Sequence, residues 1–329
     1  MDLRPPLSTG SISLRVYPHT GLEVETVVTE MCTQARLAAE AGFDGVMTSE
    51  HHGGFAGYIP NPLQAAGWLL ESMDGGWAAP CPLLLPLRPT ALVVEEVAWL
   101  AARHPGRVGV GVAAGSLVDD FEIMGLTKKG LTGRFAAGLA LLSGALGGVD
   151  PGPLAGDLAV VRCALHPVPV VSAAMSTAAV RRAADHGAGL VFDSLSTPER
   201  VRELVDAYRR AGGDRACILI RRVWMGAPPT DAMAKQVDVY RSYAAIGASA
   251  RWTADELITG DEPSEVAGAL HDAVTRAGAD AVNLRVHAPG IAPHQVRIQI
   301  AALAAVVPLL RRLLATGGQA RQRNGVPPL

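Results

Sequence analysis

The densest cluster of polar side chains in this sequence is Thr48-Ser49-Glu50-His51-His52, followed by Gly53 and Gly54. Imidazole titrates near pH ~6.5, so either histidine could transfer protons in a reaction. Neighbouring strand residues point to opposite faces, and His51 and His52 are therefore not expected to act on one ligand. Two histidines that bind zinc from a strand would be two residues apart, and the chain has no such pair. We therefore predict no metal site. Two interpretations remain: one histidine acts as an acid or base, or both simply form hydrogen bonds to the backbone.

Two further groups of residues could bind an anion. Ser176 and Thr177 precede a helical pattern over Ala178–His186, and a helix N-terminus that carries hydroxyl groups attracts anions. Plain capping of the helix is the commoner role for such hydroxyls. Arg134, at the start of an earlier helical pattern, could donate two hydrogen bonds to a phosphate, or could lie solvated at the surface.

A glycine-rich segment between Gly109 and Gly115 only partly fits a dinucleotide-binding turn. Its third glycine comes one residue late, and Ser116 begins a loop rather than a helix. Gly109 and Gly111 could instead let the backbone approach a flat ligand closely. The chain has neither the G-x-S-x-G turn of serine hydrolases nor a phosphate-binding P-loop.

Composition excludes several classes of protein. The chain has 329 residues, of which 49% are apolar and 18% charged, with 29 basic against 31 acidic side chains. This near-neutral balance predicts no nucleic-acid partner. No run reaches the ~20 apolar residues of a membrane span, and the first residues lack the apolar core of a signal peptide. The four cysteines lie far apart, which favours free thiols and a cytoplasmic location.

The elements that must position these residues follow an alternating pattern. Helical periodicity is clearest over Glu23–Ala41, Ala91–His104, Pro198–Ala211, Pro263–Ala277 and Gln295–Ala315. Eight short apolar runs alternate with helical patterns, namely Ser11–Val16, Gly45–Thr48, Pro82–Leu85, Val108–Val112, Val168–Ala173, Gly189–Phe192, Cys217–Met225 and Ala281–Val286.

This alternation predicts an α/β fold with a parallel sheet. Eight units favour a single (β/α)8 TIM barrel over residues 1–315, with a C-terminal tail over 316–329, although a doubly wound open sheet also explains the alternation. Gly226–Glu262 forms a long insertion after the seventh strand, where barrels carry lids. In a barrel, the cluster that ends the second strand would face the carboxyl-terminal mouth.

Several motifs, taken in order, resemble the bacterial luciferase-like flavin-dependent monooxygenase family. The resemblance covers nearly the whole chain and depends on the order and spacing of the motifs together. The matching stretches are 48–52, Asn61-Pro62, Leu85-Pro86-Leu87-Arg88-Pro89, Gly106–Gly111, Phe121–Gly125, Ala183–Gly187, Gly260–Ala267 and Val307–Arg311.

The resemblance implies a barrel that binds reduced FMN or, in one branch of the family, a deazaflavin coenzyme at its mouth. His51 matches the active-site base, while Arg134, Ser176 and Thr177 match positions that hold the flavin phosphate. Glu50, in the same matched stretch as His51, is expected to contact the cofactor, and Gly109 and Gly111 would leave room for the flavin ring. The chain departs from luciferase itself at Ala113 and Ala114, where luciferase has a reactive cysteine and a flavin-contacting arginine; light emission is therefore not implied.

We therefore expect a monooxygenase that uses reduced FMN and O2, through a C4a-hydroperoxyflavin, to oxidise a small and largely apolar organic substrate. The alternatives are a deazaflavin-dependent hydride-transfer enzyme and a flavin-binding protein without catalysis. A separate flavin reductase and a homodimer or homotetramer are further implications of the resemblance. The family often has a non-proline cis peptide in its third strand, for which Ala79–Leu84 is the candidate region.

Overall fold

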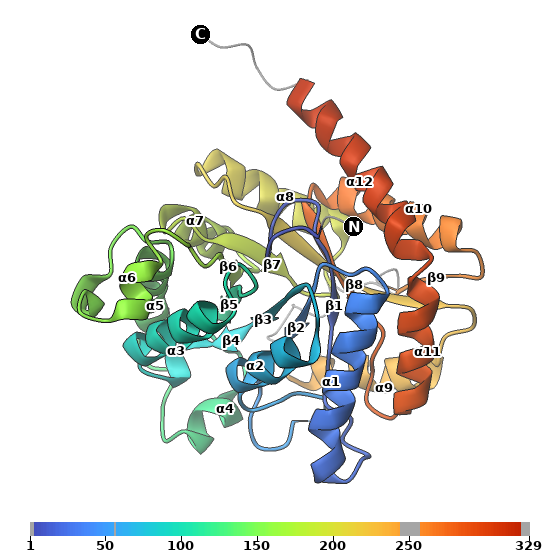
Figure 1. The fold of residues 1–329 in the computed structure, drawn as a ribbon, viewed down its shortest axis with the longest axis horizontal. Helices are drawn as coiled ribbons and strands as arrows, with labels where there is room; N and C mark the ends of the chain where they lie inside the picture. The colour runs from blue at the N-terminus through green and yellow to red at the C-terminus, as the bar shows by residue number, and fades with distance from the viewer. Residues whose placement is uncertain (1–2, 56, 244–256, 324–329) are drawn as a thin grey trace.

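The computed structural model describes residues 3–55, 57–243 and 257–323. In this part of the chain, ten strands form one parallel sheet. Eight strand positions surround a central axis, and the helices lie outside them (Figure 1). The strands of this barrel are β1 (Ile12–Arg15), β2 (Gly45–Thr48), β3 (Trp77–Pro80) with β4 (Leu83–Leu84), β5 (Val110–Ala113), β6 (Val170–Ala173), β7 (Gly189–Phe192), β8 (Cys217–Met225) and β10 (Ala281–Arg285). The predicted (β/α)8 barrel is confirmed.

The third barrel strand is divided: the predicted run Pro82–Leu85 contains β4, whereas β3 lies before it and was not predicted. β3 pairs with β2, while β4 pairs with β5. Proline has no N–H for a ladder hydrogen bond, so Pro82 interrupts the pairing at this point. The peptide bond between Cys81 and Pro82 is cis, inside the candidate region, although the family resemblance suggested a non-proline bond. A single parallel bridge between Ala78 and Val108 connects β3 to the segment just before β5.

Sequence signals explain where many helices begin and end. The Asn61 side chain caps α2, Ser176 caps α7 and Thr197 caps α8, because each side-chain oxygen accepts a backbone N–H of the first turn. Gly278 ends α10 in the left-handed conformation that glycine adopts without strain. The helices are α1 (Val24–Glu40), α2 (Pro62–Ser72), α3 (Thr90–Arg103), α4 (Val118–Ile123), α5 (Leu131–Leu146), α6 (Leu158–Arg162), α7 (Thr177–Asp185), α8 (Pro198–Arg210), α9 (Thr230–Tyr243), α10 (Pro263–Ala277), α11 (Pro293–Leu303) and α12 (Val306–Arg323).

The end of the chain forms two helices, where one helix over Gln295–Ala315 was expected. The break lies between Leu303 and Val306. Along the described residues, no single helix is both long and apolar enough to cross a membrane. α11 and the first part of α12 reach that length and apolar composition only when taken together, and they are bent by 48° relative to each other.

The long insertion after β8 contains α9 and the additional strand β9 (Leu257–Gly260). β9 pairs with Arg222–Met225, the last part of β8, and so extends the sheet beyond the barrel. Between them, residues 244–256 of the predicted lid lie outside the described residues.

The barrel interior is filled at the amino-terminal ends of the strands. Leu7, from the segment before β1, and Trp77 are buried in a cluster inside the strands. The Trp77 ring packs directly against Gly45, because a Cβ at this position would lie only 2.1 Å from the ring. A packed lower half leaves the carboxyl-terminal half of the barrel as the place for a site.

Candidate active site

A cavity of about 590 Å³ lies at the carboxyl ends of the strands. Two groups of side chains line opposite sides of it, because β5 and β6 lie across the barrel from β1 and β10. We call the first group the apolar wall, and it consists of Leu84, Ala113, Ala114, Leu117 and Ala173. The second group is the arginine–tyrosine wall, and it consists of Arg15, Tyr17, Tyr58, Tyr240 and Arg285.

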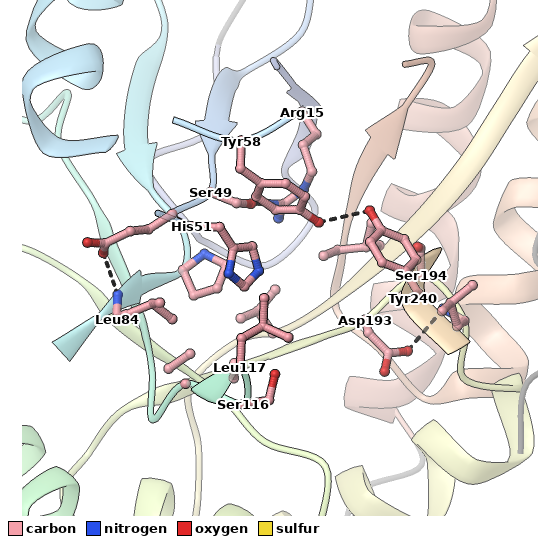
Figure 2. A pocket seen from close by; sticks show the side chains of 18 of the residues that line it. Arg15, Ser49, His51, Tyr58, Leu84, Ser116, Leu117, Asp193, Ser194 and Tyr240 are labelled. Atoms are coloured by element: carbon pink, nitrogen blue, oxygen red, sulfur yellow. Dashed lines mark hydrogen bonds between the residues drawn. The ribbon is translucent and has the colours of Figure 1, made fainter. Parts of the chain in front are cut away.

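His51 lines the cavity directly after β2 and is held by Asp120 of α4. The His51 Nδ1 lies 2.8 Å from the Asp120 Oδ2, and the other carboxylate oxygen accepts the His52 backbone N–H at 2.8 Å. Figure 2 places the His51 ring in the cavity below Tyr58. The rings of Phe55 and Tyr58 pack against it, with centroid distances of 4.8 and 4.5 Å. With Nδ1 engaged, Nε2 is the nitrogen that can exchange a proton with a bound molecule.

Asp120 is suited to stay ionised although it is buried. Burial alone would raise the pKa of Asp120, but hydrogen bonds from His51 and the His52 amide outweigh this effect and lower it. A carboxylate that accepts the Nδ1–H fixes the tautomer of the imidazole and stabilises its protonated form. The pair is therefore competent for general acid–base catalysis.

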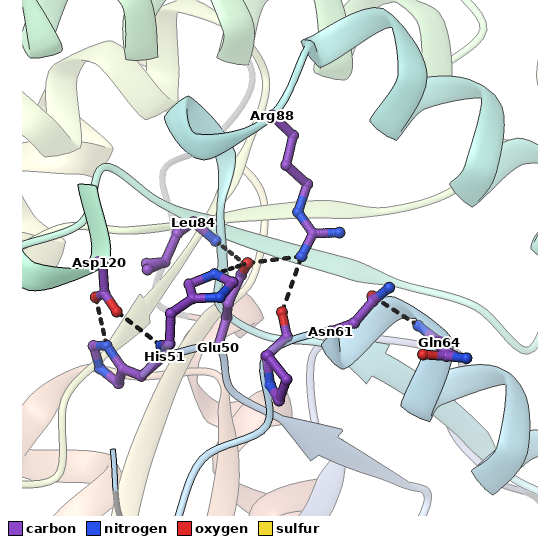
Figure 3. A network of polar contacts seen from close by, with 9 residues as sticks. Glu50, His51, Asn61, Gln64, Leu84, Arg88 and Asp120 are labelled. Carbon is purple, nitrogen blue, oxygen red and sulfur yellow. Dashed lines mark hydrogen bonds and ion pairs between the residues drawn. The ribbon is translucent and has the colours of Figure 1, made fainter. Parts of the chain in front are cut away.

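Glu50 faces the same region, but its carboxylate is fully engaged by the protein (Figure 3). One oxygen accepts the Leu84 backbone N–H at 2.6 Å, and the other lies 2.7 Å from Arg88 and 2.9 Å from the His52 ring. These bonds join the end of β2 to β4 and to the segment before α3. They also separate the two histidines, since His52 binds Glu50 while His51 binds Asp120. Glu50 was predicted to contact the cofactor. In the structure its carboxylate instead holds the cavity wall in place.

Gly109 and Gly111 do not leave room for a flavin, contrary to our expectation. A Cβ on Gly109 would lie 2.8 Å from the Leu7 side chain, at the filled end of the barrel. A Cβ on Gly111 would lie 2.2 Å from the Cys81 sulfur. The space beside both glycines is already occupied by the protein, and neither lines the cavity. The absence of a side chain serves close packing between strands at both positions.

The three residues expected to bind phosphate lie outside the cavity, on exposed surface. Arg134 donates to the backbone oxygens of Thr127, at 2.6 Å, and Lys129, and so holds the loop before α5. Ser176 caps α7 by accepting the Ala179 N–H at 3.3 Å, and Thr177 begins that helix. Ser176 follows Met175, which lines the cavity, so the N-terminus of α7 lies at the cavity rim.

The same loop brings a cation to the rim. The Lys128 ammonium donates to the Ser116 backbone oxygen at 2.8 Å, and Ser116 lines the cavity. Arg134 therefore acts on the rim by holding the segment that carries Lys128, and not by contacting the cavity itself.

Sequence reasoning missed the arginine–tyrosine wall. Arg285, which is 3% exposed, donates through Nη2 to the Tyr240 hydroxyl at 2.7 Å and through Nε to the His287 oxygen at 3.2 Å. Its guanidinium also lies over the rings of Tyr17 and Tyr240, at 4.8 and 5.5 Å. The Tyr240 hydroxyl lies 2.8 Å from that of Tyr58, as the dashed line in Figure 2 shows.

The charge on this wall is stable. Burial alone would lower the pKa of Arg285, but the phenols of Tyr17 and Tyr240 raise it, so the guanidinium remains protonated. Burial, together with the neighbouring Tyr240, raises the pKa of Tyr58, and this phenol remains neutral. The sequence signal for the two arginines is a single charged residue at the end of a strand that contains no other charge, as in Ile12–Arg15 and Ala281–Arg285.

No group of histidine, cysteine, aspartate or glutamate suited to a metal ion occurs among the residues that the structure describes. A (β/α)8 barrel with a hydrogen-bonded histidine–aspartate pair beside an open cavity at the carboxyl ends of its strands has the architecture of a barrel enzyme. Residues 11–307 match the model of the luciferase-like monooxygenase family, and the chain belongs to this family. The resemblance inferred from the sequence motifs is confirmed.

Curated relatives are similar over part of their length. The alkanal monooxygenase alpha chain of Photorhabdus luminescens is 34% identical over 93 residues, which are 27% of this chain and 25% of the relative. The corresponding chain of Photorhabdus laumondii is 31% identical over 119 residues, or 35% of this chain and 32% of the relative. The matched segments thus span about a quarter to a third of these relatives.

Solved structures show the same fold at low sequence identity. Monooxygenase RslO1 from Streptomyces bottropensis has a TM-score of 0.72 and 18% identity, with 91% of this chain and 99% of that chain covered. An F420-dependent secondary alcohol dehydrogenase in complex with an F420–acetone adduct has a TM-score of 0.70 and 16% identity, with 92% and 99% covered. The FMN complex of the oxygenating constituent of 3,6-diketocamphane monooxygenase from Pseudomonas putida has a TM-score of 0.67 and 16% identity, with 91% and 98% covered.

Proposed function

We propose that this protein is a monooxygenase that uses reduced FMN to oxidise a small organic substrate. The observation that carries the proposal is the His51–Asp120 pair, which lies in a largely apolar cavity that is closed below by the packed lower half of the barrel. Reduced FMN would supply two electrons to O2, so that one oxygen atom enters the substrate and the other leaves as water.

The apolar wall fits a flat aromatic ring. Its side chains are short where β5 ends, at Ala113 and Ala114, and longer at Leu84 and Leu117. A cavity of about 590 Å³ lies within the ~300–1,000 Å³ that is usual for cofactor and small-molecule sites. The ring would occupy this wall and leave the arginine–tyrosine wall opposite for the substrate.

The rim supplies groups suited to the flavin phosphate. Ser176 and Thr177 are at the N-terminus of α7, where unpaired backbone N–H groups and the helix dipole favour an anion. Lys128, which Arg134 keeps near Ser116, adds a positive charge. In this arrangement Arg134 contributes to phosphate binding through the position of its loop.

The side chains of the protein have defined tasks in this reaction. Asp120 orients His51, and the His51 Nε2 holds or releases the proton that the oxygen transfer requires. Phe55 and Tyr58 keep the imidazole in place and exclude water from one side of it. Tyr240 on α9 lines the cavity from the insertion, and a dry cavity would limit the loss of reducing equivalents as hydrogen peroxide.

A separate reductase would deliver the reduced FMN, and we propose the cytoplasm as the location of both proteins. The alternative cofactor is a deazaflavin, since the solved structures of similar fold include both an FMN complex and an F420-dependent enzyme. In that case the same His51–Asp120 pair would assist hydride transfer, and no oxygen atom would enter the product.

The two cofactors can be separated by one labelling experiment. The protein is supplied with photoreduced FMN and 18O2 and a panel of small organic compounds, and the products are analysed by mass spectrometry. We expect one 18O atom per product molecule, no product with reduced F420, and loss of product in His51→Ala with flavin binding retained. Oxidation without 18O incorporation, or turnover with F420 alone, would contradict the proposal. His166→Ala, at an exposed position outside the cavity, is the control.

A further inference from the structure

We propose that the substrate carries a carboxylate group and that this group binds to Arg285 on the arginine–tyrosine wall. This inference names the class of substrate for the proposed oxygenation, and it therefore rests on the proposed function. The substrate would be apolar apart from this one anionic group, because the rest of the cavity is lined mainly by apolar and aromatic side chains.

The first observation is that two buried arginines on this wall have neutral partners. Arg15 donates to the Asn283 side-chain oxygen at 2.7 Å, to the Cys81 backbone oxygen at 2.7 Å and to the Ser49 hydroxyl. Arg285 donates to a phenol and a backbone oxygen. Within the described residues, neither forms an ion pair with a carboxylate, whereas Arg88 and Arg311 pair with Glu50 and Asp44.

A buried cation without an anion nearby is costly to a folded protein, and such charges are usually paired. Arg15 uses all three of its guanidinium nitrogens inside the protein, including a contact from Nη2 to the Met47 sulfur at 3.7 Å. Arg285 uses Nε and Nη2, and its Nη1 has no hydrogen-bond partner among the described residues. Arg285 is therefore the arginine that can still bind a ligand from the cavity.

The acidic side chains that line the cavity do not neutralise this wall. Both oxygens of Glu50 are bound to Leu84, Arg88 and His52 on the other side of the cavity. Asp193, at the end of β7, accepts the backbone N–H groups of Leu195 and Ser196 at 3.0 and 2.7 Å. The positive charge of Arg15 and Arg285 consequently faces the cavity without an acidic partner on the same wall.

The geometry of the wall matches a carboxylate. A guanidinium presents its donors in a plane and binds carboxylates through two parallel hydrogen bonds. The Tyr240 and Tyr58 hydroxyls lie beside Arg285 as a hydrogen-bonded pair and offer a further donor. A substrate anchored here would extend past His51 toward the apolar wall, so that its reacting carbon lies between the acid–base pair and the flavin.

The test is direct binding of a matched pair of ligands, 2-naphthoate and 2-naphthamide, measured by titration calorimetry with the flavin-free protein. The two molecules differ in the charge of one group. We expect the wild-type protein to bind the carboxylate roughly 10- to 100-fold more tightly than the amide. Arg285→Met should abolish this preference, and Arg285→Lys should keep part of it. Arg241→Met on α9, where Arg241 is exposed and paired with Asp238, is the charge-matched control and should bind as the wild type does.

Equal binding of the two ligands by the wild-type protein would overturn the proposal, and this comparison requires no variant to fold. An undiminished preference in Arg285→Met would also overturn it. A parallel titration compares FMN with lumiflavin, which lacks the phosphate. If Arg285→Met lost a preference of the wild-type protein for FMN over lumiflavin, Arg285 would bind the flavin phosphate instead of a substrate carboxylate. The assay needs no turnover, so failure of the oxygenation experiment and failure of carboxylate binding are separate results.

Discussion

At the scale of single residues, the proposed chemistry depends on a pair of side chains that are far apart in the sequence. His51 follows β2, whereas Asp120 lies in α4 after β5, and the two meet at 2.8 Å. Sequence analysis predicted His51, because a dense polar cluster at a strand end indicates a site in a barrel. Asp120 carried no such signal, since Asp119-Asp120 is also typical of a surface loop or a helix start.

Substitution of Asp120 by asparagine should lower kcat about 100-fold and leave flavin affinity and KM unchanged. An amide cannot stabilise the protonated imidazole, and it would favour the wrong tautomer of His51. Steady-state kinetics with reduced FMN measure the effect. A purely structural role is tested by urea denaturation of the variant, because a residue that acts through His51 lowers turnover while the protein stays folded and binds flavin.

The network around Glu50 makes a prediction about stability. Glu50→Gln should lower the free energy of unfolding by about 2–4 kcal/mol, because the amide removes the negative charge beside Arg88 and keeps only one acceptor oxygen, so that either Arg88 or the Leu84 N–H loses its partner. Urea denaturation measures this change. The exposed pair Arg36–Glu40 is the control, and Glu40→Gln should change stability by less than about 0.5 kcal/mol. A similar small effect for Glu50→Gln would show that the network does not hold the wall.

At the scale of elements, alternation of strands and helices was enough to predict the barrel, and local caps were enough to place several helices. The first segment of the third strand was missed because Trp77–Pro80 and Leu83–Leu84 are both short and apolar, and a sequence does not show which run pairs with β2. Gly109, just before β5, and Gly111, within it, were assigned to the flavin site for a related reason. A glycine that admits a ligand and one that admits a neighbouring side chain look the same in a sequence.

The packing role of Gly111 can be tested by adding one methyl group. Gly111→Ala should destabilise the protein by about 1–3 kcal/mol, since the new Cβ would lie 2.2 Å from the Cys81 sulfur. Gly268→Ala, in α10 with nothing within 4 Å, should stabilise it by about 0.5–1 kcal/mol. Thermal and urea denaturation of both variants provide the comparison. A Gly111→Ala protein of unchanged stability that no longer binds flavin would restore this glycine to the flavin site.

At the scale of the whole molecule, buried histidines should make stability depend on pH. Burial holds the pKa of His287 well below its usual value, and burial also lowers that of His19. Because the unfolded chain binds these protons and the folded one does not, stability is complete above pH ~6.5 and falls as the pH decreases below it. Each such group contributes up to about 1.4 kcal/mol per pH unit.

His287→Phe should therefore reduce the slope of the unfolding free energy between pH 6.5 and pH 5. Phenylalanine keeps an aromatic ring against Tyr17 and removes the proton uptake. At pH 8 the imidazole is neutral in both the folded and the unfolded state. The difference in unfolding free energy between variant and wild type at this pH therefore measures the effect of the substitution apart from proton uptake. An identical slope in the variant would show that His287 does not contribute to the pH dependence.

The central claim is that the cavity at the barrel mouth is a flavin site, and an anaerobic titration with photoreduced FMN tests it most directly. We expect one equivalent to bind with a Kd in the micromolar range or tighter. Ala114→Trp, which fills the apolar wall, should abolish binding, whereas Ala155→Trp at an exposed position should not. Binding of reduced F420 in place of FMN, or unchanged FMN binding in Ala114→Trp, would contradict the account.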